Sequence, residues 1–153
     1  MKWKYTNQQE LGEGDEESTA AIEALLAGKM NVGGGGGGGA VRAIENEVYF
    51  YGDVSESNAL ELNSTLHAVD KKLAVSGQFL DVNPIINLRI NSYGGSLFAG
   101  LATLDTIRNL NAEVHTYIDG AAASAATIIS AAGTKRYIGK YSKMLIHQLS
   151  SGM

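Results

Sequence analysis

Along most of the chain, hydrophobic and polar positions follow periods that predict strands alternating with helices. Residues 47–51 form a β-type run. Residues 55–75 carry leucines and a valine near helical spacing, which predicts a helix that Ser76 and Gly77 break. Apolar and polar residues then alternate over 86–90, which indicates the next strand.

The following units repeat this plan. A glycine-rich turn over 91–95 leads to Ser96, which is expected to cap a helix whose apolar residues recur at steps of four and three as far as Leu110. The remaining predicted elements are a strand over 114–118, a turn of small residues, a helix over 125–132 and short strands at 137–138 and 144–146. Strands and helices that alternate with short links imply an α/β fold with a mostly parallel sheet.

The first 40 residues differ in composition from the rest. Acidic side chains gather before residue 18, a short helix is expected over 18–26, and seven consecutive glycines occupy 33–39. Such a run cannot hold a helix or strand against its backbone entropy, so we interpret it as a flexible linker. A phosphate-binding loop is the sharper alternative, but such loops place single glycines before a Lys-Ser/Thr pair, which does not follow here. We therefore expect an N-terminal extension over 1–40 and a folded domain over 41–153.

The composition narrows the function classes. A chain of 153 residues with 44% hydrophobic residues is long enough for one folded domain. Its net charge of −4 gives no reason to expect nucleic acid or a membrane surface as a partner. There is no cysteine, which excludes disulfides and thiolate metal sites, and no metal or cofactor is expected. No run approaches the roughly 20 apolar residues that span a bilayer, and the start is a poor secretory signal, so we expect a cytoplasmic protein.

Ser124 is the first candidate for chemistry. It stands between the apolar strand and the helix over 125–132, with alanines on both sides. The free amides and the dipole of a helix N-terminus favour negative charge, and small neighbours let a substrate backbone approach the hydroxyl. The G-x-S-x-G elbow of α/β-hydrolases uses small residues for the same reason, but this chain lacks that motif. On this stretch alone, a small residue that packs a helix onto the sheet explains the serine better than catalysis does.

His147 is the second candidate. It ends the apolar run over 144–146, and a base at a strand end can face a cleft while its strand stays buried. A neutral imidazole is the natural partner for a serine. A half-buried structural histidine is the alternative, and the pattern alone does not choose between the two. His67 and His115 lie in settings that indicate structural roles.

The pair Gly94-Gly95 is the third candidate. Glycines between a strand and a helix leave amides exposed, and those amides could bind an oxyanion or let an extended peptide add to the adjacent edge. A turn that needs positive φ is the structural alternative.

Together, three separate blocks resemble a known family. INSYGGSLFAG at 90–100, DGAAASAATIISAAG at 119–133 and MLIHQ at 144–148 are similar, in order and separation, to the signature blocks of the ClpP-type peptidases, which are the proteolytic subunits of Clp proteases and their phage relatives. The segment 45–54 resembles the first core strand of that family. The resemblance covers about 41–153 and implies a ClpP/crotonase-like α/β fold of repeated strand-turn-helix units. The form of the second block is closer to phage head-maturation relatives, which suggests a role in prohead maturation.

The resemblance assigns roles residue by residue. Ser124 matches the nucleophile of a serine endopeptidase and His147 the general base, and the amides of Gly95 and Ala125 match the oxyanion hole. The residues expected to bind substrate along a strand-like edge, or on the opposite side of the groove, are Gly94, Ser96, Leu97 and Leu149. Tyr93 stands where the family usually has proline, which is expected to change the stiffness of the turn and not the chemistry.

The resemblance also implies partners. A peptide or an unfolded protein is the expected substrate, and the full-length protein is expected to form a homo-oligomeric ring. An AAA+ unfoldase, or phage capsid and scaffold proteins, are the expected further partners.

The end of the chain departs from the family pattern. The third catalytic residue of the family is an aspartate from a later part of the fold, whereas this chain stops six residues after His147. No residue here matches that aspartate, and the C-terminal part of the fold is expected to be missing. Asp119 is the nearest acidic candidate, and capping a turn is its expected role.

Three alternatives to an active peptidase remain open at this point. The chain is interpreted alternatively as a catalytically impaired fragment or as a non-catalytic assembly or scaffold protein. Acyl-CoA enzymes of the crotonase type share the repeated units but need no serine-histidine pair. A Ser-Lys signal-peptide peptidase fits less well, because a histidine stands in the expected place and no membrane anchor is found.

Overall fold

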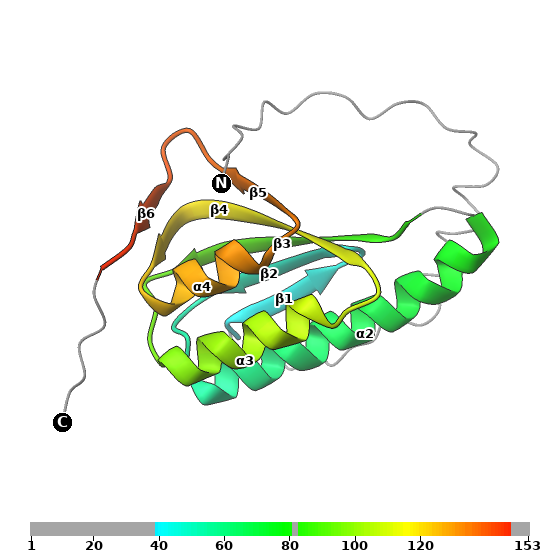
Figure 1. The fold of residues 1–153 in the computed structure, drawn as a ribbon, viewed down its shortest axis with the longest axis horizontal. Helices are drawn as coiled ribbons and strands as arrows, with labels where there is room; N and C mark the ends of the chain where they lie inside the picture. The colour runs from blue at the N-terminus through cyan, green and yellow to red at the C-terminus, as the bar shows by residue number, and fades with distance from the viewer. Residues whose placement is uncertain (1–38, 81–82, 148–153) are drawn as a thin grey trace. The chain divides into compact units, whose positions relative to one another are not determined.

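The computed structural model describes residues 39–80 and 83–147 (Figure 1). From Ala40 onward, these residues belong to one compact unit. The predicted helix at 18–26, the glycine run as far as Gly38 and Leu149 lie outside the described residues. The division into an extension over 1–40 and a domain over 41–153 therefore stays a prediction.

The described elements follow the predicted alternation of strands and helices. In chain order they are β1 (Val41–Ile44), β2 (Glu47–Tyr51), α2 (Glu56–Leu80), β3 (Ile85–Ser92), α3 (Leu97–Arg108), β4 (Glu113–Ala123), α4 (Ala125–Ala132), β5 (Lys135–Ile138) and β6 (Lys143–Leu145). The predicted strand at 47–51 and the predicted helix at 125–132 are confirmed at both ends. Strand β1 is an addition to the prediction, and it forms an antiparallel hairpin with β2.

Helix α2 is longer than the sequence pattern predicted. The expected break at Ser76 and Gly77 is wrong, because the helix continues to Leu80. The Ser76 hydroxyl donates to the Lys72 carbonyl oxygen at 3.3 Å, so it is satisfied inside the helix and does not end it. A single interior glycine costs a helix only about 1 kcal/mol relative to alanine. The packing of the earlier turns against the sheet outweighs this cost.

Strand β4 also extends beyond its prediction. The expected turn of small residues after Ile118 is wrong, because 119–123 remain part of the strand. Gly120, with φ of 89°, introduces an irregularity there without ending the strand. The strand reaches the start of α4 with a single residue, Ser124, between them.

The sheet is mostly parallel, as predicted. Its strand order is β1-β2-β3-β4-β5, and β6 pairs with β4 beside this path. Strands β5 and β6 use different parts of β4, because β5 pairs with residues 115–118 and β6 with residues 121–123. The end of β4 that leads to Ser124 is therefore paired with β6.

All three described helices pack on one face of the sheet (Figure 1). Alternate residues of the central strands point into this layer, so polar residues between them face the other way. Full burial of each large aliphatic side chain stabilises the fold by about 1.5–3 kcal/mol. The residues that form this core include Val48, Phe50, Ile86, Leu88, Ile90, Val114 and Ile118 from the strands and Leu62, Leu66, Val69, Ile107 and Ile129 from the helices.

A buried carboxylate joins α2 to the loop before β4. Asp70 is 4% exposed. Its carboxylate accepts hydrogen bonds from the backbone N–H of Ala112 at 2.7 Å, the backbone N–H of Asn111 at 3.3 Å and the Asn111 side-chain amide at 3.0 Å. This carboxylate fixes where β4 begins relative to the helical layer.

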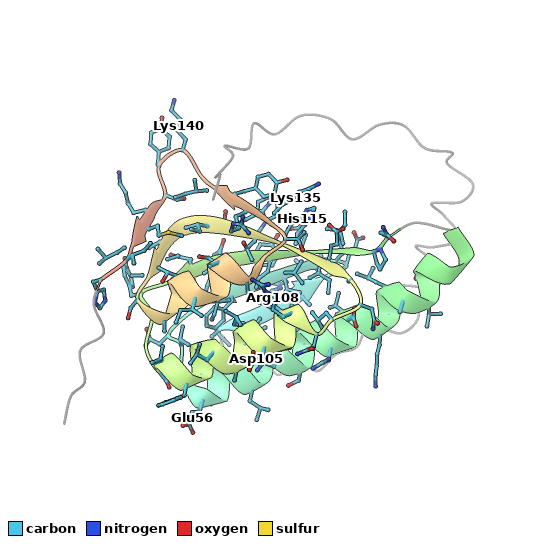
Figure 2. The ribbon with its side chains drawn as sticks, viewed as in Figure 1. Glu56, Asp105, Arg108, His115, Lys135 and Lys140 are labelled. Atoms are coloured by element: carbon cyan, nitrogen blue, oxygen red, sulfur yellow. The ribbon has the colours of Figure 1, made fainter. Side chains whose placement is uncertain are left out.

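Replacing Asp70 by alanine is expected to destabilise the fold. The change leaves the buried N–H of Ala112 and the part-buried donors of Asn111 without acceptors, and the loss at a buried donor costs about 1–3 kcal/mol. Urea unfolding of Asp70→Ala should show this loss. The control is Asp105→Ala, at an exposed position on α3 (Figure 2), which is expected to change the free energy of unfolding by less than about 0.5 kcal/mol. Equal losses in the two variants would contradict the role of Asp70.

Candidate active site

Ser124 occupies a strained position at the junction of β4 and α4. Its φ of 52° and ψ of −126° lie outside the regions that residues other than glycine ordinarily adopt. It is the N-cap residue of α4, yet its side chain makes no capping hydrogen bond. Serine at this position usually bonds the amides of the first helical turn. The hydroxyl of Ser124 is therefore not used by the helix that it precedes.

The backbone of Ser124 is tied to the segment that carries His147. The parallel pairing of β4 with β6 ends at Ala123 opposite Leu145, and the Ser124 N–H then donates to the Leu145 carbonyl oxygen at 3.0 Å. His147 follows Leu145 by two residues and is exposed. The sheet therefore brings the two candidate residues for acid-base chemistry to the same strand ends.

The glycine turn lies directly against this junction. Gly94 and Gly95 have φ of 97° and 148°, so the positive φ that the sequence suggested is confirmed at both. A Cβ added at Gly94 would lie 2.5 Å from the Ala123 carbonyl oxygen and 2.7 Å from the Ser124 Cβ. Only glycine at this position allows the turn to approach Ser124 so closely.

A short bridge to the start of α2 holds the other side of the turn. Val54 donates its N–H to the Gly94 carbonyl oxygen at 2.9 Å and accepts from the Ser96 N–H at 2.7 Å. A Cβ at Gly95 would lie 2.4 Å from the Val54 carbonyl oxygen, so this bridge also requires glycine.

Two backbone amides near Ser124, those of Gly95 and Ala125, have no acceptor among the hydrogen bonds of the described residues. In the part of the chain that the structure describes, the Gly94 N–H donates to Ser92 Oγ, whereas the Gly95 N–H has no acceptor. The N–H of Ala125 is the first of α4, and such amides have no partner within the helix. The arrangement can stabilise negative charge next to the Ser124 hydroxyl.

Of the other predicted substrate-binding residues, Ser96 and Leu97 lie at the start of α3. Ser96 is the N-cap of α3, and its side chain accepts from the Ala99 N–H at 3.3 Å. Leu97 is the first residue of α3, so it opens a helix and does not continue an extended edge. Leu149 lies outside the described residues. Substrate contact by these residues stays a prediction.

Asp119 does not cap a turn, so that expectation is wrong. It lies within β4, and its two carboxylate oxygens are 3.2 and 3.1 Å from Arg89 Nη1. The Tyr51 hydroxyl also donates to it at 3.1 Å. Arg89 in turn donates through Nε to Glu47 at 2.8 Å. The hydrogen-bonding capacity of Asp119 is directed at β2 and β3.

This network lies on the face of the sheet that no described helix covers. Arg89 is 5.0 Å from the centroid of the Tyr117 ring, which stacks on Tyr137 with ring centroids 4.6 Å apart. Burial by itself lowers the pKa of Arg89, but hydrogen bonds to Glu47 and Asp119 and the charges of both raise the pKa above its ordinary value. Burial, followed by the Asp119 carboxylate, raises the pKa of the Tyr51 phenol.

The structure adds two residues that the sequence reasoning missed. Asn91 Oδ1 accepts from the Ala121 N–H at 3.1 Å, and Ser142 Oγ accepts from the Gly120 N–H at 2.8 Å. Both side chains hold the irregular part of β4 that leads to Ser124. The only signal in the sequence was the glycine at 120, which shows where a strand needs unusual geometry.

The described residues contain neither a metal-binding cluster nor a membrane-spanning helix. Within 39–80 and 83–147, no cluster of three or more His, Cys, Asp or Glu side chains is arranged to bind a metal ion. None of the helices in those ranges has the length and apolar character needed to cross a membrane.

Comparison with known proteins identifies the family. The family model described as Clp protease matches residues 45–153. The chain belongs to the Clp protease family. The resemblance of the three sequence blocks is thereby confirmed.

Relatives of this Clp protease chain match over parts of their length. The ATP-dependent Clp protease proteolytic subunit 2 of Chlamydia trachomatis is 50% identical over 70 residues, which are 44% of this chain and 34% of the relative. The ATP-dependent Clp protease proteolytic subunit of Cyanophora paradoxa is 35% identical over 113 residues, 61% of this chain and 58% of the relative. The match with the first of these spans about a third of that relative's length.

Solved structures of the family share the fold. ClpP1 from Listeria monocytogenes superposes with a TM-score of 0.59 at 25% identity, over 69% of this chain and 58% of that one. A mutant of the same protein gives a TM-score of 0.57, also at 25% identity, over 66% and 55% of the two chains. The predicted ClpP-type α/β fold is confirmed.

The raised pKa of Tyr51, caused by burial and then by the Asp119 carboxylate, predicts how the stability of this Clp protease chain depends on pH. The folded pKa of Tyr51 is raised, so above the unfolded value of about 10 the unfolded phenol ionises while the folded one stays protonated. The free energy of unfolding is therefore unaffected by this group below pH about 10 and falls as the pH rises further. Tyr51→Phe should show a smaller fall in urea unfolding between pH about 8 and about 11.

The control for this measurement is Tyr141→Phe. Tyr141 is 85% exposed, and its removal should leave the fall in stability equal to that of the unmodified protein. If Tyr51→Phe lost as much stability over the same pH interval as the unmodified protein, Tyr51 would not be the source of the pH dependence.

Proposed function

We propose that this chain carries the active site of a ClpP-type serine peptidase that hydrolyses peptide bonds. Ser124 is the nucleophile, His147 the general base, and the amides of Gly95 and Ala125 form the oxyanion hole. Family membership supports the reaction class. The residue roles are supported by the geometry of the β4–α4 junction.

One observation carries the proposal. Ser124 sits at φ 52° with a hydroxyl that does not cap α4, and its N–H is bonded to Leu145, two residues before His147. Backbone strain of this kind costs of order 1–3 kcal/mol and persists where the surrounding structure imposes it, which is commonly at functional sites. A serine that served only to pack a helix on the sheet would have no need of this conformation.

The first half of the reaction forms an acyl-enzyme. The Ser124 oxygen attacks the carbonyl carbon of the substrate while its proton passes to the imidazole of His147. The carbonyl oxygen becomes an oxyanion, which the amides of Gly95 and Ala125 and the N-terminal end of α4 stabilise. The C–N bond then breaks, and His147 gives the proton to the leaving amine.

The second half releases the acid. Water attacks the ester carbon and gives a proton to His147, and the same amides stabilise the second oxyanion. The bond from carbon to the Ser124 oxygen breaks, and the serine takes the proton back from His147. The residues end in the state in which they began.

Exposed apolar side chains near the junction support an extended peptide as substrate. Tyr93 and Phe98 flank the glycine turn and are each 80% exposed, and Leu145 and Ile146 precede His147 at 57% and 75%. An unfolded segment with apolar side chains could cover part of this surface on both sides of the scissile bond.

The assembly and partners proposed for the whole protein rest on the family. The relatives are named ATP-dependent proteolytic subunits, which supports an ATPase partner that delivers unfolded substrate. We extend the proposal to a homo-oligomeric ring in the cytoplasm, with a phage maturation role as the variant that the form of the block at 119–133 favours.

A fluorophosphonate probe tests the nucleophile. We expect the probe to label the chain at Ser124, because it reacts with a hydroxyl whose oxyanion product is stabilised. Ser124→Ala should remove the labelling, which mass spectrometry of the labelled peptide would locate. The matched control is Ser64→Ala, at an exposed serine of α2, which should label as the unmodified chain does.

A histidine pair tests the base in the same assay. His147→Ala should slow labelling by about 10²- to 10⁴-fold, which is the usual contribution of a positioned general base. His67→Ala, at an exposed histidine on α2, should have no effect. Labelling that survives Ser124→Ala, or that slows equally in both histidine variants, would refute the assigned roles.

A further inference from the structure

Strand β4 contains an insertion just before the active site. Ile90 of β3 pairs with Ile118, but the next recorded pair is Ser92 with Ala122, so two steps on β3 correspond to four on β4. Gly120 lies within the inserted stretch at φ of 89°. Such bulges change the direction of a strand and the residues that its end presents, and they are common beside active sites.

Side chains from other elements hold each residue of this bulge. Asp119 is bound by Arg89, the Gly120 N–H donates to Ser142 Oγ at 2.8 Å, and the Ala121 N–H donates to Asn91 Oδ1 at 3.1 Å. A Cβ at Gly120 would lie 2.8 Å from Asn91 Oδ1, so the side chain of Asn91 is packed on the bulge as well as bonded to it.

Ser142 comes from the loop between β5 and β6. The tip of this loop carries Lys140 (Figure 2), and the Ser142 N–H donates to the Gly139 carbonyl oxygen at 3.0 Å. The Gly139 N–H in turn donates to the Ile118 carbonyl oxygen at 3.1 Å. The loop is therefore attached to β4 both before the bulge, at Ile118, and within it, at Gly120.

The bulge marks the point at which β4 changes partners. Before it, residues 115–118 pair with β5, and after it, residues 121–123 pair with β6. The second pairing ends with the bond from the Ser124 N–H to Leu145. The number of residues in the bulge thus decides which residue of the segment after β6 lies beside Ser124.

Asn91 also connects this bulge to the glycine turn. Its own carbonyl oxygen accepts from the Gly52 N–H at 3.1 Å, and the next residue, Ser92, accepts from the Gly94 N–H through Oγ at 3.1 Å. One side chain therefore links the strand that leads to the oxyanion amides with the strand that leads to the nucleophile.

We propose that Asn91 is a positioning residue of the active site. Through the amide of Ala121 it holds the register of β4 against β6, and so it sets the position of Ser124 relative to His147. The catalytic consequence rests on the proposed peptidase function, whereas the control of register is a property of the fold that can be measured separately.

The test compares Asn91→Ala, Asn91→Asp and Asn87→Ala in the whole chain. The first removes the acceptor for Ala121, and the second keeps an acceptor oxygen at the same distance from the backbone. The third is the matched control, because Asn87 lies on the same face of β3 and donates to Glu47 at 2.6 Å, away from the bulge.

Amide hydrogen exchange gives the readout that does not depend on activity. In Asn91→Ala, the protection of the Ser124 amide should fall about tenfold or more, equivalent to about 1.4 kcal/mol, while that of 114–118 stays unchanged. Asn91→Asp and Asn87→Ala should keep the protection of Ser124. If Asn91→Ala does not fold, Ser142→Ala should show the same selective loss.

Peptide hydrolysis gives the second readout. In Asn91→Ala, kcat should fall by about 10²-fold with KM within about twofold, because a displaced nucleophile loses rate and not binding. Asn91→Asp should recover most of kcat.

Three outcomes would contradict either the positioning role of Asn91 or the proposed peptidase function. Unchanged protection of Ser124 in Asn91→Ala would overturn the proposal, and so would an equal loss in Asn87→Ala. If the unmodified chain neither hydrolysed peptides nor reacted with the probe, while Asn91→Ala still loosened Ser124, the peptidase function would fail and the control of register would be supported.

Discussion

The candidate site depends on the parallel pairing of three residues at the end of β4 with β6. This ladder closes with the bond from the Ser124 N–H to the Leu145 carbonyl oxygen, and it is what brings Ser124 and the segment that carries His147 together. The glycine turn is added to it by contact, since Gly94 allows the approach to Ala123 and Ser124 that any side chain would block. Without the ladder, the glycine turn would lie against Ser124 with no histidine segment paired beside it.

The sequence was sufficient for the family and for the order of the elements from β2 onward. The elements at 47–51 and 125–132 were predicted to the residue, because a β-type run ends at Gly52 and a run of small and apolar residues ends at Gly133. The blocks around Ser124, His147 and the glycine pair were recognisable because their chemistry demands particular residues. A serine, a histidine and a glycine pair can be located by their positions in a sequence, whereas composition alone does not locate them.

The features that the sequence did not predict depend on tertiary contacts. The continuation of α2 through Gly77 and of β4 through Gly120 contradicts local preference, and packing and side-chain acceptors from elsewhere decide both. The role of Asp119 was missed for the same reason, because its partner Arg89 lies thirty residues earlier in the chain. Asn91 and Ser142 resemble ordinary strand and loop residues until the backbone amides that they satisfy are known.

The shortness of β6 has a consequence for how the protein fails. Three residues at the outer side of β4, with Leu145 largely exposed, contribute little buried surface, so this strand belongs to the part of the molecule that opens at the lowest free energy. Met144 is the residue of β6 that packs, partly buried, against the core beneath the helices. Warming should therefore separate the histidine segment from Ser124 before the helical structure is lost.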